Sequence, residues 1–278
     1  MAHILICPIC HGALQKDGGA YRCQKNHSYD ISRFGYTNLL SGKAVGQHGD
    51  NREMILARRR FLDSGAYAPL RDALCETMCA IHPKGGVYLD AGCGECYYTD
   101  GVASALAGTN SIGYGIDISK EALRAAAIRP SVKNGEVNLF VSGVYEMPFA
   151  DGCIDTVMNF FAPLATEEYL RVLKDGGILV MAIPDKRHLF ALKEVLYDIP
   201  KENEVADFAL NGFDLLSATP IQSTFTLGGE EKQDLFMMTP YYYRTPQSGK
   251  DRLSALESLR VSAEFILLVY RKRPQEST

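Results

Sequence analysis

Four residues near the start of the chain have the types and spacing of a zinc site. Two residues lie between Cys7 and Cys10, twelve between Cys10 and Cys23, and three between Cys23 and His27. Three thiolates and one imidazole form a tetrahedral ligand set for Zn²⁺. The intervening LQKDGGAYRC predicts a hairpin that turns at Asp17-Gly18. So short a segment lacks a core of its own, and the metal would supply its folding free energy.

A second chemical pattern is LDAGCGECYYT. Asp90 ends a predicted strand, and Gly92 and Gly94 follow where the chain must turn tightly and let a ligand touch the backbone. The third glycine of a dinucleotide fingerprint would fall at Tyr97, so a dinucleotide is disfavoured. Asp117 ends the next strand, where a carboxylate can accept both hydroxyls of a ribose. The pattern predicts an adenosine with an uncharged extension.

The elements that must position these residues alternate along the body of the chain. Such alternation predicts an α/β fold, a mostly parallel sheet with helices on both faces. We expect strands at 85–91, 111–117, 136–141, 153–160 and 178–184, and helices at 97–108, 119–128, 165–173 and 187–198. The C-terminal part should add a strand in FDLLSATPIQSTFTL, helices near 231–238 and 249–259, and a last strand at 264–270, which completes seven strands.

The segment between the zinc site and this body is polar. Residues 28–62 contain scattered glycines and predict a loop or linker, out of which a helix starts. Asp50 and Glu53 have the spacing of a capping box, and Gly65 should end the helix. A second helix is expected from Pro69 to Ile81. The expected domains are a zinc-binding head (1–40), a linker with helices (41–82) and a body (83–278).

Charge is distributed unevenly between the head and the body. Residues 1–62 hold nine Lys/Arg and four Asp/Glu, which leaves 20 against 29 for residues 63–278. A basic end on an acidic body suits a protein whose small end meets a polyanion. Candidate contacts with RNA phosphates are Arg58, Arg59 and Arg60, which spread too far around their helix to share a core, together with Arg22, Lys25 and Arg33. A solvated helix face is the alternative for the three consecutive arginines.

Composition and cysteine usage indicate a cytosolic globular protein. No apolar run is long enough for a membrane span, and the N-terminus lacks the features of a signal peptide. Eight cysteines in a reducing compartment are metal ligands or core residues rather than disulfides. We expect Cys75 and Cys79 to be buried on one helix face, and we disfavour redox chemistry for Cys93 and Cys96.

Several motifs together resemble a known family. LDAGCGECYYT, GYGIDIS, EMPFADGCIDTVMN and LRVLKDGGILV are similar to the successive motifs of the class I S-adenosylmethionine methyltransferases. With the zinc head, GDNREMILARRRFLDSGAYAPLRD, NFFAP and PDKRHLFALKEVLY, the chain resembles the RlmA family from residue 7 to about 272. These are zinc-containing bacterial enzymes that methylate N1 of a guanine in a hairpin loop of 23S rRNA. The resemblance therefore implies a Rossmann-like body that binds S-adenosylmethionine.

The resemblance also implies roles for individual residues. It assigns Cys7, Cys10, Cys23 and His27 to zinc, and Tyr67, Gly94, Glu95 and His188 to the cofactor, alongside Asp90, Gly92, Asp117 and Asn159. Cys96 stands where the family often has glycine, and we expect its side chain to point into the cofactor turn.

The segment after the fourth predicted strand bears on the methyl acceptor. Enzymes that methylate exocyclic amines commonly carry Asn/Asp-Pro-Pro-aromatic here, whereas this chain has Asn-Phe-Phe-Ala-Pro. This difference from the exocyclic-amine motif agrees with a ring nitrogen such as guanine N1 as the methyl acceptor. Phe160 or Phe161 could stack on a flipped base, or the two rings could simply pack in the protein. Asp185 and His188 are candidates for the base that takes the N1 proton.

The sequence predicts a 23S rRNA guanine-N1 methyltransferase. Two other functions stay open: a methyltransferase for a small molecule such as a quinone precursor, and a catalytically silent RNA-binding protein. The retained Asp90, Gly92, Gly94 and Asp117 weigh against the silent protein, and the basic head weighs against the small molecule. The sequence leaves the oligomeric state open, a homodimer included, as well as the choice of guanine.

Overall fold

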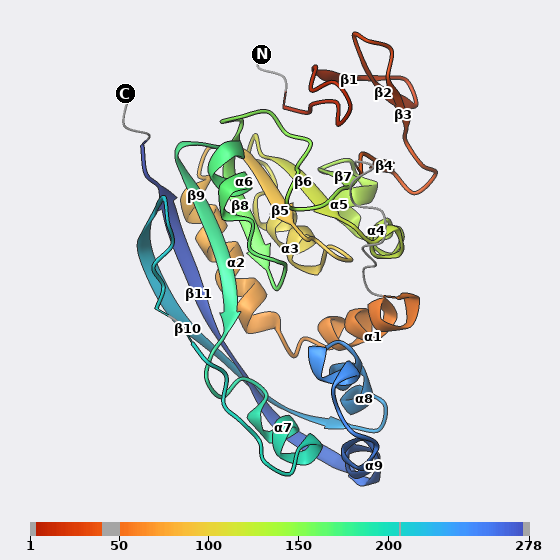
Figure 1. Cartoon of the computed structure of the whole chain (residues 1–278), viewed down its shortest axis with the longest axis vertical. Coiled ribbons are helices and arrows are strands. Elements are labelled where there is room, and N and C mark those ends of the chain that lie inside the picture. The colour runs from red at the N-terminus through yellow and green to blue at the C-terminus, as the bar shows by residue number, and fades with distance from the viewer. Residues whose placement is uncertain (1–3, 41–50, 206, 275–278) are drawn as a thin grey trace.

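A computed structural model describes residues 4–40, 51–205 and 207–274. Figure 1 shows a central twisted sheet with helices packed around it and the small N-terminal head at one end. Within the described residues this sheet has eight strands. Their order is β10 (Phe213–Gly228), β11 (Ser258–Lys272), β9 (Leu173–Pro184), β8 (Ile154–Phe160), β5 (Val87–Ala91), β6 (Ile112–Asp117), β7 (Val137–Val141) and β4 (Tyr36–Asn38).

The sheet confirms the predicted fold class. Strands β4 to β9 pair in parallel, and β11 lies antiparallel between β9 and β10. Seven of the strands are the ones we expected from the sequence. The eighth, β4, comes from the segment that we took for a linker, and it pairs with β7 from Tyr36↔Leu139 to Asn38↔Val141. Three residues at a sheet edge carry too short an alternation for sequence periodicity to find.

Helices cover both faces of the sheet. Tyr88 and Leu89 are neighbours on β5, yet they are buried in different hydrophobic clusters because side chains alternate across a strand. One face is covered by α2, α3, α4 and α7, and the other by α6 and the head. The bounds are α2 (Ala68–Ile81), α3 (Tyr97–Ala105), α4 (Lys120–Ala126), α5 (Pro130–Lys133), α6 (Thr166–Val172) and α7 (Phe190–Leu196).

Helix α1 (Arg52–Asp63) follows β4 in the chain and packs against α3, α4 and α8 (Glu231–Met237). The side chain of Asn51 caps it by accepting a hydrogen bond from the amide of Met54 (3.0 Å). The cap is therefore one residue later than the Asp50 we predicted, which lies outside the described residues. Phe61 and Leu62 of α1 enter the same hydrophobic cluster as α2, so both helices share the core of the body.

The connection between β10 and β11 returns to α1. It contains α8 (Glu231–Met237), the short 3₁₀ helix η2 (Pro240–Tyr243) and α9 (Gln247–Ala255). Figure 1 places α8 beside α1 at the lower end of the molecule. Arg60 of α1 and Asp234 of α8 join the two helices, with 2.8 Å between Nε and Oδ2.

The head is a three-stranded sheet of β1 (Leu14–Asp17), β2 (Ala20–Cys23) and β3 (Ser28–Asp30). Asp17 pairs with Ala20, so the hairpin turns at Gly18-Gly19, one residue later than predicted. The head is fixed to the body because Leu5 bridges Phe149 and the ring of Tyr21 meets Phe140 edge-on at 5.4 Å.

None of the helices in the described part of the chain has the length and apolar character to cross a membrane.

Candidate functional site: a zinc ribbon and a cofactor cavity

The head brings the four predicted zinc ligands together. Their ligand atoms all lie within 4.8 Å of one another, with 3.6 Å between the sulfurs of Cys10 and Cys23. Nδ1 of His27 is 3.4 Å from the sulfur of Cys7 and 3.3 Å from that of Cys23. A tetrahedral ion with Zn–S near 2.3 Å and Zn–N near 2.0 Å requires separations of about 3.8 and 3.5 Å. The four residues therefore fit zinc.

The surroundings of Cys7 favour its thiolate. Burial alone would raise the pKa of this thiol, but hydrogen bonds from the Tyr29 hydroxyl (3.1 Å) and from the backbone of Cys10 and Ile9 outweigh burial. Together they lower the pKa of Cys7 to about 6. A thiol that ionises this readily is a ready metal ligand.

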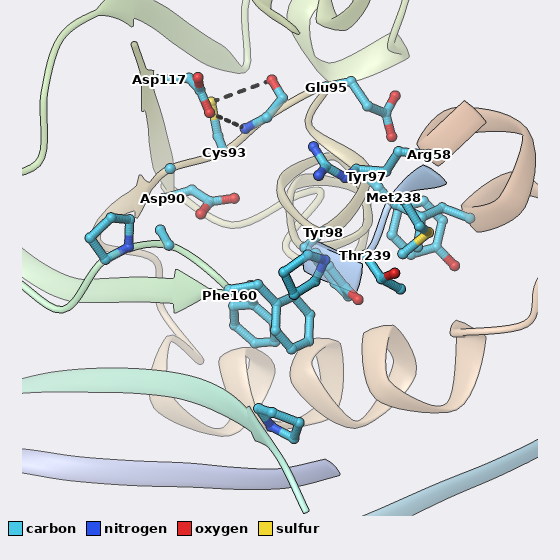
Figure 2. Close-up of a pocket in the computed structure, with 18 of the residues that line it drawn as sticks. Arg58, Asp90, Cys93, Glu95, Tyr97, Tyr98, Asp117, Phe160, Met238 and Thr239 are labelled. Atoms are coloured by element: carbon cyan, nitrogen blue, oxygen red, sulfur yellow. Dashed lines mark hydrogen bonds between the residues drawn. The ribbon is translucent and has the colours of Figure 1, made fainter. Parts of the chain in front are cut away.

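A cavity of about 620 Å³ opens at the carboxyl ends of β5, β6 and β8. Helix α1, the glycine turn, the segment after β8 and residues 238–241 line it, and Figure 2 draws 18 of the lining residues and labels ten of them. Ligands of open α/β sheets bind at this edge. Seven of the eight residues that we predicted to contact the cofactor line this cavity, and Asn159 is the exception.

The glycine turn after β5 leaves room for a ligand. Gly92 has φ 92°, and a Cβ there would lie 2.4 Å from the Cβ of Ala162, so only glycine fits. Gly94 has φ 55° and no heavy atom within 4 Å of where its Cβ would be. This open side lies on the cavity, because Gly94 is one of its lining residues.

Asp117, at the end of β6, holds the turn and lines the cavity. One carboxylate oxygen accepts the amide of Gly94 (2.9 Å), and the other accepts the amide of Ser119 (2.7 Å). Figure 2 shows it at the end of the cavity next to Cys93. Each oxygen keeps further lone pairs, as two ribose hydroxyls would need.

Asp90 is buried in the cavity wall, and among the described residues only one of its two carboxylate oxygens has a hydrogen-bond partner. The Thr99 hydroxyl donates to Oδ2, whereas Oδ1 is buried and has no hydrogen-bond partner. Burial raises the pKa of Asp90 to about 7, and the Thr99 hydrogen bond counteracts this in part. An unsatisfied buried acceptor calls for a donor from a ligand.

The carboxylate of Glu95, the residue after Gly94, is buried and paired with two arginines. Its side chain is 1% exposed and lies 2.6 Å from Arg129 and 3.0 Å from Arg59. Burial raises the pKa of Glu95, and the two arginines oppose the rise. The pair of arginines thus ties the turn to α1 and to the start of α5.

The three consecutive arginines face three different surroundings. Arg58 lines the cavity, Arg59 pairs with Glu95, and Arg60 pairs with Asp234. Arg59 and Arg60, predicted as candidate RNA contacts or as part of a solvated face, therefore each pair with a carboxylate of the protein, and the Arg60 side chain is still 56% exposed. Sequence could not reveal this, because those partners lie 36 and 174 residues away in the chain.

Asn159 and Cys96 lie elsewhere than predicted. The amide of Asn159 donates to the Tyr169 hydroxyl (2.6 Å) and the Pro163 carbonyl (3.1 Å), so it shapes the segment after β8 from outside the cavity. Cys96 adopts the left-handed region (φ 64°), which explains a family preference for glycine, and its side chain is buried among Leu123 and other apolar residues. Cys96 is not among the residues that line the cavity.

The two helical cysteines also differ from expectation. Cys79 is exposed and Cys75 is half-buried, so neither is a full core residue. In the described ranges, the zinc cluster of the head is the single group of three or more Cys, His, Asp or Glu side chains close enough to share a metal.

Aromatic rings form the far wall of the cavity. Phe160 is 6% exposed and packs on Tyr98, with 4.8 Å between ring centroids. Phe161 is 50% exposed, adopts φ 64°, and lies 5.5 Å from the ring of Phe265. A bulky residue in the left-handed region is strained, and such strain gathers at functional sites. Both predicted stacking residues line the cavity, and Phe161 is the more exposed of the two.

Neither candidate base is well suited to take the N1 proton. His188 lines the cavity beside Tyr67, but burial lowers its pKa to about 4, and Nδ1 contacts the backbone of Glu264. Asp185 is not a lining residue, and its carboxylate accepts the amide of Lys186 (2.7 Å). The site supports His188 as a neutral neighbour of the cofactor.

Sequence reasoning missed some lining residues altogether. Tyr145 after β7, Asn203 before β10 and residues 238–241 contribute to the cavity. These loops carry no periodic signal. The exposed aromatic in SGVYEMPF is the clue that could have indicated Tyr145.

Comparison with known proteins identifies the family. Residues 5–43 match the family model for the N-terminal zinc ribbon of RlmA, and residues 82–234 match a methyltransferase domain. A protein of Micromonospora griseorubida is 34% identical over 96% of this chain and 97% of its own, and one of Bacillus subtilis (strain 168) is 31% identical over 91% of each. The names of both contain 23S rRNA (guanine-N(1)-)-methyltransferase.

The chain belongs to this 23S rRNA (guanine-N(1)-)-methyltransferase family. The 23S rRNA (guanine(748)-N(1))-methyltransferase of Streptomyces fradiae is 27% identical over 97% of both chains. S-adenosylmethionine and zinc are the two cofactors of this methyltransferase, and the residues present fit both. Gly94 offers an open backbone, Asp117 a diol acceptor and Asp90 an unsatisfied acceptor for an ammonium group.

Changing Cys10→Ser should remove zinc from the protein. The head then loses its main source of folding free energy, and residues 4–30 should become sensitive to protease, while the cavity still binds cofactor. Metal analysis and limited proteolysis measure both effects. Unmutated protein that carries no zinc would refute the site.

Cofactor affinity should fall as the pH drops below about 7. In the unliganded protein Asp90 is protonated below its pKa of about 7, and it must ionise to accept from an ammonium group. One linked proton gives a change of up to about tenfold per pH unit, levelling off above the pKa. Calorimetry between pH 5.5 and 7.5 measures it, with Asp90→Asn as the isosteric control that should bind weakly and without this slope. An identical slope in Asp90→Asn would exclude Asp90.

Proposed function

We propose that this protein transfers a methyl group from S-adenosylmethionine to N1 of a guanine in a hairpin loop of 23S rRNA, in the cytoplasm. The observation that carries the proposal is the half-exposed, strained Phe161 at a cavity that fits the cofactor. The RlmA-type zinc ribbon and the near full-length relatives support it.

The mouth of the cavity suits a flipped base. Phe161 and Tyr145 line it from different loops, and they are 50% and 62% exposed. Bases that leave a stack are held between aromatic rings, and a hairpin loop gives up a base at lower cost than a duplex. Tyr98 and Phe265 support the Phe161 ring from behind.

The transfer forms an N1–methyl bond, breaks the sulfur–methyl bond of S-adenosylmethionine and releases the N1 proton to water, and the site supplies the alignment of the reacting atoms. S-adenosylmethionine supplies a methyl group on a positively charged sulfur. Asp117 and the glycine turn would hold the adenosine, while Phe161 would hold the guanine so that N1, methyl and sulfur are in line. Positioning of this kind accounts for up to about 7–11 kcal/mol of a barrier.

The head would dock the RNA. Lys16, Arg22, Lys25 and Arg33 are exposed on it. Basic side chains neutralise phosphates and release counterions, which gives affinity without sequence preference. Arg22, Lys25 and Arg33 are candidate RNA contacts predicted together with the arginines of α1, of which Arg59 and Arg60 also pair with carboxylates of the protein.

A small-molecule methyltransferase is the weaker candidate. It would use the same cavity, but it would have no need of a basic head or of an aromatic pair at an open mouth. A silent RNA-binding protein would have no reason to keep Asp90 buried with an unsatisfied oxygen.

Radiolabelled S-adenosylmethionine decides among the three. Incubated with an rRNA hairpin transcript and a metabolite extract, the protein should label the RNA, and primer extension should stop at one loop guanine, because an N1 methyl blocks Watson–Crick pairing. A transcript with adenine at that position should take no label. Label in the metabolites alone would favour the small-molecule enzyme. The absence of label from both fractions would favour the silent RNA-binding protein.

Phe161→Ala should lower methylation of the RNA by about 10- to 100-fold, since stacking of a base on an aromatic ring contributes about 1–3 kcal/mol. Phe161→Tyr is the matched control and should keep most of the activity. Calorimetry should show unchanged cofactor binding in both variants. Full turnover in Phe161→Ala would rule out stacking on this ring.

A further inference from the structure

The charges that line the cavity are unequally distributed. Among its described lining residues the carboxylates are Asp90, Glu95 and Asp117, and Arg58 is the one cationic side chain. His188 is neutral near pH 7 because burial lowers its pKa to about 4. A ligand of this cavity therefore meets one positive group.

Two of the three carboxylates already have a defined task. Glu95 is compensated by Arg59 and Arg129. Asp117 lies at the glycine end, where it accepts the amides of Gly94 and Ser119. Asp90 and Arg58 are a negative and a positive group that both line the cavity, and Figure 2 shows them reaching toward it from opposite sides.

Helix α1 presents Arg58 to the cavity in a fixed position. The residues on either side of it are anchored, since Ala57 is fully buried and Arg59 pairs with Glu95 at 3.0 Å. One turn further along, Phe61 and Leu62 enter the core. The backbone at Arg58 is thus held by a packed helix that contacts the residue directly after Gly94.

We propose that Arg58 binds the α-carboxylate of the methionyl part of S-adenosylmethionine, opposite Asp90, which takes the α-ammonium group. A guanidinium donates two parallel hydrogen bonds to a carboxylate, and a carboxylate is the natural acceptor for an ammonium group. The two side chains would recognise a zwitterion, which corrects our expectation of an uncharged extension.

This assignment moves Arg58 from the RNA to the cofactor. The cavity around it carries carboxylates, which disfavour an RNA phosphate but suit a ligand with its own positive groups. The inference rests on the cofactor of the proposed function and not on its RNA substrate.

Two ligands separate the carboxylate from the rest of the cofactor. S-adenosylmethionine and decarboxylated S-adenosylmethionine, which lacks only that group, are titrated by calorimetry into the unmutated zinc-containing protein and into Arg58→Ala. The unmutated protein should prefer S-adenosylmethionine by about 10- to 100-fold, the size of a charge-assisted hydrogen-bonded pair. Arg58→Ala should lose that preference and bind the decarboxylated ligand as the unmutated protein does.

Arg60→Ala is the matched control for damage to α1. This variant removes the contact between α1 and Asp234 of α8. Because Arg60 does not line the cavity, the preference should persist. Melting temperatures of both variants verify that the fold is kept.

Two results would overturn the proposal. An equal loss for both ligands in Arg58→Ala, or loss of the preference in Arg60→Ala as well, would mean that the arginines only place the helix. Unchanged cofactor binding, together with weaker binding of the rRNA hairpin and a log–log salt slope flatter by about one unit, would assign Arg58 to a phosphate. The cofactor titration contains no RNA, so a failure of the rRNA assay would leave its result intact.

Discussion

The buried charge of Glu95 is the constraint on which the site depends. Its carboxylate is almost inaccessible to water and is held by Arg129 on one side and Arg59 on the other. Removing one partner of a buried ion pair costs about 3–5 kcal/mol, because an uncompensated charge remains. The sequence neighbour of Glu95 is Gly94, so the cofactor turn, α1 and the start of α5 can be in place only together.

The N-terminal part of the chain is joined to the body at further points. Helix α1 fixes the turn, α8 is joined to α1 through Arg60 and Asp234, and β4 joins the sheet beside β7. Residues from the first quarter of the chain thereby complete a cavity whose floor belongs to the methyltransferase domain. A methyltransferase domain without this N-terminal part would lack one wall of its site.

What the sequence reveals depends on the range of the interaction. The zinc ligands and the glycine turn are set by neighbours a few residues apart, and the alternation of strands and helices predicts the sheet; these features agree with the structure. The partners of Arg59 and Arg60 depend on distant segments, and so does the direction of Asn159. β4 is too short to show an alternation of polar and apolar residues in the sequence, and Cys79 lies on an exposed part of α2.

The edge strand β4 sets a fixed distance between two surfaces. It follows the head directly, and Leu39 donates to the carbonyl of Val141, one residue before the loop that carries Tyr145 to the cavity. Through this hydrogen-bonded strand pair, the basic head and the aromatic mouth are held at a set distance from each other, which can act as a molecular ruler. For an RNA gripped at the head, the ruler would select the nucleotide by its reach along the loop, with no need to read neighbouring bases.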